Sequence, residues 1–328
     1  MNFQSQLVSA VIPAYNAEQF VCSAVGSALD QTHANVEVIV VDDGSSDGTL
    51  AVLQEIADPR LRVIVQPNAG VSAARNRAIA ESAGEYVAFL DADDVWDPTK
   101  LSRQLDVLEE HPEWTGVGAL MHHVGAEGRV LGVAGHRVGP AEQRAIREAR
   151  LNPFPISSLL VRRAVIDRVG LFDEDLHRHA PGGVEDLDFV SRIAAAGFLG
   201  CVEEVLGGYR MHGGSSSARY FRSQRQGARY LVARTAARAA GDTLTFADFE
   251  RGRGQAVRHW WIDTAAYCYR AAGVALAEGQ PLHAVWWAAP ALIMDPARTL
   301  RRLALQRGRL RSYPSSGPYG GESGRTRG

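Results

Sequence analysis

Strand-like and helix-like segments alternate through the first hundred residues, and this alternation limits the possible fold more than any other feature. Four apolar runs are expected strands, at residues 7–12, 36–41, 61–65 and 86–90, with helical patterns between them at 20–29, 49–57 and 72–82. The run at 36–41 is β-branched and nearly continuous, as in a parallel strand that is covered on both faces. We expect the first strand to end at Pro13. The sequence therefore predicts an α/β fold, an open and mostly parallel sheet with helices on both faces.

Three of the expected strands end in polar clusters. These are Pro13-Ala14-Tyr15-Asn16 after the first strand, Asp42-Asp43-Gly44-Ser45 after the second and Asp91-Ala92-Asp93-Asp94 after the fourth. Ligands bind open parallel sheets beyond the carboxyl ends of the strands, so we expect the clusters to meet at one edge. Carboxylates there lose bulk water but keep their charge, which is costly unless a cation or a donor-rich ligand is present. A divalent metal with a bound diphosphate would meet that requirement.

The acidic clusters also have a purely structural interpretation. Aspartate is common in turns and at helix N-termini, and an isolated Asp-x-Asp pattern is more often a turn than a site. Ser45, Ser46 and Asp47 fit this interpretation best, because they directly precede an expected helix.

The composition is that of an ordinary globular protein. The 328 residues carry a formal net charge of −2, and nothing in this balance favours nucleic acid as a partner. Cys22, Cys201 and Cys268 lie far apart without a C-x-x-C pattern, which favours a reducing compartment. The N-terminus lacks the basic region of a signal peptide, and no apolar stretch reaches the roughly 18 residues that span a bilayer. We therefore expect a cytoplasmic protein with one large domain and an appendage.

The rest of the chain gives weaker signals. Residues 117–124 and 130–133 are expected to pair as a hairpin, 156–161 to form a strand, and 164–169 and 187–196 to form helices. From about residue 223 the sequence turns helical and rich in alanine and arginine, and residues 313–328 are predicted to be disordered. We accordingly divide the chain into a first domain at 1–220, a helical C-terminal region at 221–312 and a tail at 313–328.

With these clusters in view, the sequence resembles a family 2 glycosyltransferase of the GT-A fold. The resemblance is carried by residues 8–16, 42–49, 68–76 and 84–94, together with Gly170-Leu171-Phe172-Asp173-Glu174 and Glu185-Asp186-Leu187-Asp188-Phe189. It covers roughly residues 7–215 and implies a Rossmann-like sheet. The nucleotide-sugar half would occupy about 7–115 and the acceptor half about 116–220. The motifs are specific for the fold and the donor type, and much less specific for the sugar.

The resemblance assigns roles to the acids after the fourth strand. It implies Asp93 as the direct ligand of Mn²⁺ or Mg²⁺ and Asp91 as a contact of the ribose or of metal-bound water. Asp94 would support these two acids or cap a helix. His212 is a further candidate, which would close over the diphosphate or complete the metal shell, although a lone histidine is more often a loop residue.

The resemblance also implies an acceptor-side acid. Asp186 would remove the proton from the acceptor hydroxyl, and Glu185 would position the acceptor. Both residues open an expected helix, where the helix dipole alone favours acidic side chains.

The donor is expected to contact the strand ends and the helix after the third strand. The resemblance implies that Asp43 binds the uracil while Asp42 braces the loop. Arg75 suits a phosphate or a base carbonyl, and Gly70 permits a positive φ or a close approach to the ligand. The residues expected to bind the donor are Pro13, Ala14, Tyr15, Asn16, Glu18, Asp43, Gly70, Arg75, Asp91, Ala92 and Arg210.

Together these features predict an inverting, metal-dependent glycosyltransferase. It would move a sugar from a nucleotide-sugar donor, UDP-linked by preference, to a saccharide or lipid-linked acceptor. One alternative is a nucleotidyltransferase, which would carry a glycine- and basic-rich loop where Pro13-Ala14-Tyr15-Asn16 stands. Another is a catalytically silent module that binds a nucleotide-sugar or a membrane. A dinucleotide oxidoreductase is disfavoured, because no G-x-G-x-x-G follows any strand.

The C-terminal region suggests contact with the inner face of an anionic membrane. Residues 284–294 combine tryptophan with aliphatic side chains, and no acid lies between Pro296 and Ser312. The arginines that follow are Arg298, Arg301, Arg302, Arg307, Arg309 and Arg311. This is the composition of an interfacial anchor. The alternative is a helix packed on the catalytic domain with its arginines facing water.

Overall fold

A nine-stranded sheet forms the centre of the structure, which is a computed structural model. It describes residues 6–125, 128–180, 184–212, 220–251, 256–297, 299–301 and 304. The expected tail at 313–328 lies outside these residues, and so do five of the six C-terminal arginines, Arg298, Arg302, Arg307, Arg309 and Arg311.

The sheet has a parallel half and a mixed half. The parallel half contains β1 (Val8–Ala14), β2 (Val36–Asp42), β3 (Leu61–Val65) and β4 (Tyr86–Phe89), in the spatial order β3-β2-β1-β4. The mixed half continues with β8 (Leu160–Arg162), β6 (Trp114–Val124), β9 (Phe198–Arg210) and β5 (Val95–Trp96), while β7 (Val130–Ala134) pairs with β6. β8 runs antiparallel to both of its neighbours, and β6 and β9 are parallel. The predicted α/β sheet and the hairpin of β6 and β7 are confirmed, although among the described strands parallel pairing is confined to β1–β4 and to β6 with β9.

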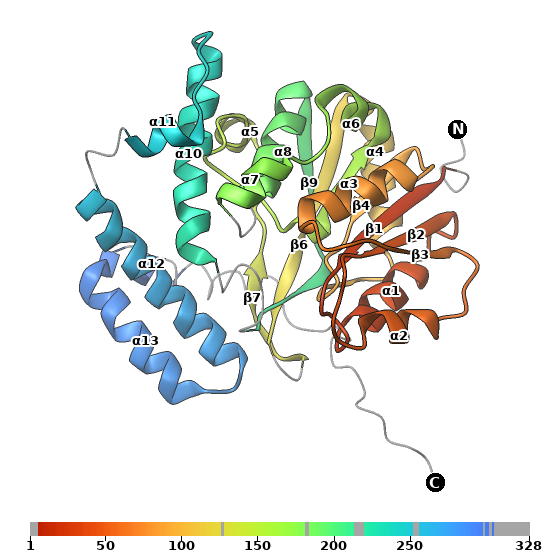
Figure 1. Cartoon of the computed structure of the whole chain (residues 1–328), viewed down its shortest axis with the longest axis horizontal. Helices are drawn as coiled ribbons and strands as arrows, with labels where there is room; N and C mark the ends of the chain where they lie inside the picture. The colour runs from red at the N-terminus through yellow and green to blue at the C-terminus, as the bar shows by residue number, and fades with distance from the viewer. Residues whose placement is uncertain are drawn as a thin grey trace.

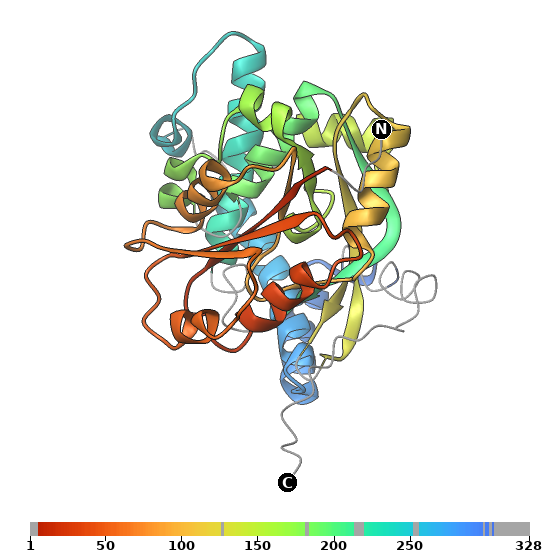
Figure 2. The same ribbon diagram turned by 90° about the vertical axis from the view of Figure 1, so that its right-hand side faces the viewer.

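Helices cover both faces of the sheet, as the alternation in the sequence predicted (Figures 1 and 2). One face packs against α1 (Val21–Leu29), α2 (Thr49–Gln54) and α4 (Lys100–Glu110). The other packs against α3 (Val71–Glu81), α5 (Pro140–Arg147), α6 (Arg163–Val169) and α8 (Val184–Ala196). The sheet core is therefore closed to water on both sides, which leaves the strand ends as the place for polar chemistry.

The C-terminal helices pack at one side of this sandwich. They are α10 (Phe221–Ala239), α11 (Phe246–Arg251), α12 (Ala256–Ala277) and α13 (Pro281–Met294). α10 joins α7 (Glu174–His179) and α8 through an apolar cluster that includes Leu176, Leu187 and Tyr230. Figure 1 shows α12 and α13 beyond α10, on the side away from β3. Within the described part of the chain, no helix combines the length and the apolarity that crossing a bilayer requires.

Several element boundaries differ from the sequence predictions. β3 begins and ends as predicted, but the helix expected at 49–57 ends at Gln54. The strand expected at 156–161 begins with a 3₁₀ turn at Ile156–Ser158 and is extended only in β8. The sequence did not reveal β5, β9, α4, α5 or α7.

The prediction that β1 ends at Pro13 is wrong, because β1 continues to Ala14. A proline inside a central strand normally removes a ladder hydrogen bond. Here β4 pairs with β1 only as far as Val11, whereas β2 pairs with β1 through Ala14. The backbone N–H and C=O groups of successive residues in a strand point alternately to the two neighbouring strands. The backbone nitrogen of Pro13 therefore points toward the β4 side, beyond the last residue of β1 that β4 pairs with. The missing N–H costs no ladder bond there.

The tight approach between β1 and the turn before β4 gives a test of this packing. A Cβ atom on Gly84 would lie 2.7 Å from Ser9 N and 2.8 Å from Leu7 O, both of them backbone atoms. We expect Gly84→Ala to lower the free energy of unfolding by about 2 kcal/mol in urea denaturation, because the backbone must shift. The control is Gly26→Ala in α1, where nothing lies within 4 Å of the new atom. This control should leave the free energy of unfolding unchanged or raise it by up to about 1 kcal/mol. Equal effects would contradict the packing.

Candidate active site

The turns after β1 and β2 are tied together by Asn16 and Glu18. The Asn16 N–H donates to Ser45 Oγ (3.0 Å), and Asn16 Oδ1 accepts from the Ser46 N–H (2.8 Å). Asn16 adopts a φ of 49°, a conformation that asparagine tolerates better than most residues. Glu18 Oε2 accepts from the Gly48 N–H at 3.1 Å. Both side chains thus shape the loop, and their expected contacts with the donor stay predictions.

Asp43 organises the loop that leads into α3. Its Oδ1 accepts hydrogen bonds from Gln66 Nε2 (2.8 Å) and the Ala69 N–H (2.9 Å), and its Oδ2 accepts one from the Gly70 N–H (2.8 Å). Gly70 has a φ of 92°, which confirms the expected positive φ. Since Oδ1 already has two donors, Oδ2 is the oxygen with an acceptor position left for a base. Asp42 accepts from the Ser45 N–H at 3.2 Å, so the expectation that it braces the loop is confirmed.

The other residues expected at the donor site differ in their exposure to solvent. Tyr15 is exposed at the end of β1, where its ring is available to a ligand. Pro13, Ala14 and Ala92 are buried, so they act on the shape of the turns rather than through exposed side chains.

Arg75 joins the donor side of the site to the acceptor side. From α3, its Nη2 donates to Asp91 Oδ1 and its Nη1 to Asp186 Oδ1, each at 2.6 Å. The guanidinium carbon lies 5.3 Å from the centre of the Phe172 ring, and the side chain is 3% exposed. The structure thus brings three predicted site residues together. The fork expected to bind phosphate is occupied by carboxylates, and the phosphate contact stays a prediction.

The acids around Arg75 have raised pKa values. Burial raises the pKa of Asp186 to about 7, Arg75 opposes this shift, and the nearby charges of Glu185 and Asp91 add to it. The pKa of Asp91 is also raised, chiefly by burial, with Arg75 again opposing and Asp93 adding to the shift. A carboxyl group with a pKa near 7 is suited to accept and release a proton at neutral pH.

Asp94 connects the Asp91–Asp94 turn to two later segments. Its Oδ2 accepts from Ser157 Oγ (2.5 Å), and its Oδ1 accepts from the Arg210 N–H (2.8 Å). Burial and the charges of Asp93 and Asp91 raise its pKa well above the usual value. Asp94 therefore supports its neighbours. It does not cap α4, whose N-cap is Thr99.

Ser157 is a residue of the candidate site that the sequence did not reveal. Its Oγ also accepts from the Asp91 N–H at 3.1 Å, so it contacts both ends of the turn. Arg210 adds a second link, because its Nε donates to the Asp93 carbonyl at 2.9 Å. The only available signal for Ser157 was a pair of serines inside an otherwise apolar run.

Asp93 and His212 offer donors that fit a divalent cation. Asp93 Oδ2 lies 2.9 Å from His212 Nε2, and the side chains are 30% and 27% exposed, so a cation can reach both. The described residues contain no group of three His, Cys, Asp or Glu side chains arranged for a metal. Mg²⁺ is usually bound by a few protein ligands, and phosphate oxygens complete its coordination shell. Imidazole is a common metal ligand. The residues present therefore fit an ion that arrives with a diphosphate.

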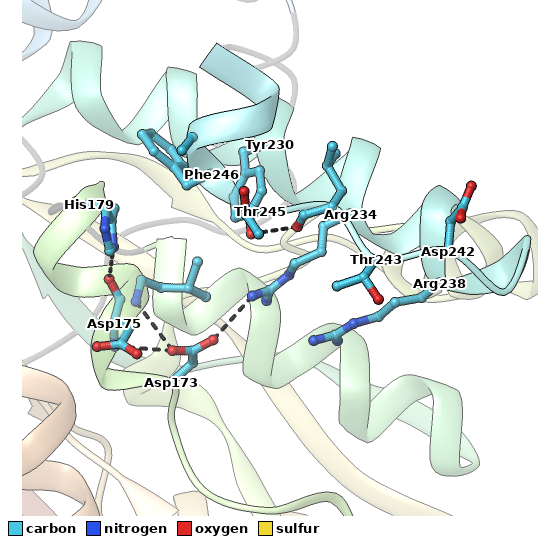
Figure 3. Close-up of a pocket in the computed structure, with 13 residues that line it drawn as sticks. Asp173, Asp175, His179, Tyr230, Arg234, Arg238, Asp242, Thr243, Thr245 and Phe246 are labelled. Carbon is cyan, nitrogen blue, oxygen red and sulfur yellow. Dashed lines mark hydrogen bonds and ion pairs between the residues drawn. The ribbon is translucent and has the colours of Figure 1, made fainter. Parts of the chain in front are cut away.

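A separate cavity of about 420 Å³ lies between α7 and the α10–α11 segment (Figure 3). Arg234 in its wall donates to Asp173 Oδ2 at 3.1 Å and pairs with Asp188 of α8. Asp188 also accepts from Arg192 Nε at 2.8 Å. None of the residues expected to bind donor or metal lines this cavity. Its ion pairs link α10 to the helix that carries Asp186.

Comparison with known proteins identifies the family. The model described as glycosyl transferase family 2 matches residues 9–168. An uncharacterized glycosyltransferase of Haemophilus influenzae is 32% identical over 237 residues, which are 69% of this chain and 72% of that protein. This chain belongs to glycosyl transferase family 2. It is a glycosyltransferase, as the sequence predicted.

Two other relatives match this chain over a smaller share of their own length. An uncharacterized glycosyltransferase of Nostoc sp. is 33% identical over 221 residues, 64% of this chain and 66% of its own. The Escherichia coli protein WfgD is named a UDP-Glc:alpha-D-GlcNAc-diphosphoundecaprenol beta-1,3-glucosyltransferase. It is 41% identical over 103 residues, 31% of this chain and 41% of its own. The chain thus spans less than two thirds of either relative.

The predicted GT-A fold is confirmed by a solved structure. The mannosyltransferase PcManGT from Pyrobaculum calidifontis, in complex with GDP-Man and Mn²⁺, superposes with a TM-score of 0.53. The match covers 96% of this chain and 82% of that chain at 18% identity, so it shows the fold alone.

The Arg75 bridge predicts a large and pH-dependent effect of substitution. We expect Arg75→Met to lower the free energy of unfolding by about 3 kcal/mol at pH 8, because two partly buried carboxylates lose the buried cation that pairs with them. The loss should shrink as the pH falls below about 7, since the folded state can then protonate Asp186, whose pKa is already raised to about 7.

Arg77 provides a matched control on the same helix. Its ion pair with Glu81 is exposed, so Arg77→Met should cost less than about 0.5 kcal/mol at either pH. Urea denaturation of both variants at pH 8 and pH 6 makes the comparison. A small, pH-independent effect of Arg75→Met would show that the bridge does not form.

Proposed function

We propose that this family 2 enzyme transfers a sugar from a UDP-linked donor to a saccharide or lipid-linked acceptor, with inversion at the anomeric carbon. The observation that carries the proposal is the Arg75 bridge, which places Asp186 beside the Asp91–Asp94 turn. The proposed catalytic domain covers residues 1–220, and the helical region follows from 221.

Asp186 is the proposed base. An acceptor hydroxyl within reach of its carboxylate gives up its proton as the oxygen attacks the anomeric carbon. The new bond joins the acceptor oxygen to that carbon, and the bond from the carbon to the diphosphate oxygen breaks on the opposite face. One displacement of this kind inverts the configuration and needs no covalent intermediate. Glu185, buried beside Asp186, raises the pKa of Asp186 and so favours its uptake of the proton.

The donor side has the task of holding the nucleoside diphosphate. Asp93 and His212, with Asp91 beside them, would hold Mn²⁺ or Mg²⁺. The ion would neutralise charge on the departing diphosphate. The exposed ring of Tyr15 and Asp43 Oδ2 are the proposed contacts of the base. Arg210 is proposed to line the diphosphate side, because its guanidinium already lies beside the Asp93 carbonyl.

The relatives support the choice of donor and acceptor. WfgD is named for a UDP-glucose donor and a lipid-diphosphate acceptor, and its match includes 31% of this chain. We propose the same classes of donor and acceptor here, in polysaccharide or glycoconjugate synthesis for the cell envelope. A lipid-linked acceptor would require the enzyme to work at the cytoplasmic face of a membrane.

The metal proposal predicts donor binding that depends on both cation and Asp93. In thermal-shift measurements, UDP-sugar with Mn²⁺ should stabilise the wild type by about 2.7 kcal/mol at a hundred times Kd. Chelation, or Asp93→Ala, should remove most of this gain, because the diphosphate loses its counter-ion. The matched control is Asp106→Ala on the exposed face of α4, which should behave as wild type. An equal gain with and without metal would rule out the metal role.

The base proposal predicts a defined pH profile. Since only the deprotonated carboxylate can accept a proton, kcat/KM should rise with pH and level off above about 7, the pKa of Asp186. Asp186→Asn should reduce turnover by about 10²–10⁴-fold while leaving donor binding intact. Asp175→Asn, at an exposed position on α7, is the control and should keep full activity. Unchanged turnover in Asp186→Asn would remove this residue from the mechanism.

A further inference from the structure

The outer face of α13 has the reverse of the usual polarity of a surface helix. Helices of soluble proteins turn large apolar side chains inward and polar ones toward water. α13 instead buries two small residues, Ala284 and Ala291, as it packs on α12. Tyr267 of α12 lies against Trp287 of α13, with ring centres 5.6 Å apart.

Large apolar side chains gather on the opposite face. Leu282 is 84% exposed, Trp286 67% and Ile293 79%, and Val285 lies beside them. Their spacing of three, four and seven residues places them along one stripe of the helix. Pro281–Met294 contains no Asp, Glu, Lys or Arg, and Leu300 beyond its end is exposed as well. A continuous exposed patch of this kind marks a binding surface.

The charge that follows the helix indicates what covers this patch. Arg301 is exposed directly after Leu300, and the sequence from Arg298 to Arg311 contains six arginines and no acid. Tryptophan with aliphatic residues beside a cationic segment matches the boundary between lipid tails and anionic headgroups. Figure 1 shows α13 at the outer edge of the molecule, with α12 between it and α10. Because the buried alanines of α13 pack on α12, the stripe on the opposite face is turned away from α12.

We infer that the stripe of Leu282, Val285, Trp286 and Ile293 is a docking surface for an anionic lipid bilayer. The helix lies along the membrane with these side chains below the headgroups, and Arg301 after it contacts anionic lipid. This inference rests on the proposed function, because docking brings the catalytic domain to a lipid-linked acceptor. It also explains why a helix that packs through alanine keeps its largest apolar residues outside.

Vesicle flotation tests the surface directly. The full-length enzyme is mixed at low salt with phosphatidylcholine vesicles, with or without phosphatidylglycerol. We expect binding to the anionic vesicles, weakened by added salt. The triple variant Leu282→Ser/Trp286→Ser/Ile293→Ser should bind the anionic vesicles with an affinity at least about tenfold lower, because the inserted apolar surface is lost. Leu171→Ser, an exposed leucine outside the C-terminal helices, is the control and should bind as wild type.

The outcomes separate this inference from the proposed function. Absence of wild-type binding to anionic vesicles, or equal binding by the triple variant, overturns it. A concentration-dependent dimer in light scattering that the triple variant loses also overturns it, since a second copy would then cover the patch. A free energy of unfolding equal to that of the wild type in urea denaturation shows that the triple variant is folded. Vesicle binding without any sugar transfer would contradict the proposed function and leave the docking surface supported. Sugar transfer to a water-soluble acceptor without vesicle binding would contradict the docking surface and leave the proposed function supported.

Discussion

A single guanidinium connects the parts of the candidate active site. Arg75 binds Asp91, 16 residues further along the chain, and Asp186, 111 residues further along. The three side chains come from α3, from the turn after β4 and from α8, so their meeting depends on the whole parallel sheet and on the helices of one face. Because Arg75 is buried against Phe172, the pairing is held in one geometry rather than screened by water.

The charges around this guanidinium do not balance, and the proposed chemistry of the site depends on this imbalance. One arginine faces Asp91, Asp186 and the nearby Glu185. The excess acid, together with burial, raises the pKa values of Asp91 and Asp186. The same excess favours the arrival of a cation at Asp93 and His212. The proposed proton acceptance by Asp186 and the proposed metal binding at Asp93 and His212 would thus have one electrostatic cause.

Local patterns in the sequence were sufficient for the parallel half of the sheet and the turns at its edge. β3 and the positive φ of Gly70 follow from residue type and short-range spacing. The bracing role of Asp42 came from the resemblance to the family. The Arg75 bridge could not be found this way, because it depends on where α8 lies in space. Ser157 was missed because its apolar neighbours predicted a strand over residues 156–161. The stripe on α13 was hidden because that helix is apolar on all sides, so its sequence does not show which face packs.

The most direct test of this account is the titration of the Asp186 carboxyl group by ¹³C NMR, with Asp186→Asn to assign its signal. The account predicts a midpoint at about pH 7 in the metal-free protein, because burial and the neighbouring acids outweigh Arg75. A midpoint near the ordinary value of 3.8 would contradict it, since Asp186 would then be a solvated carboxylate with no reason to act as the base.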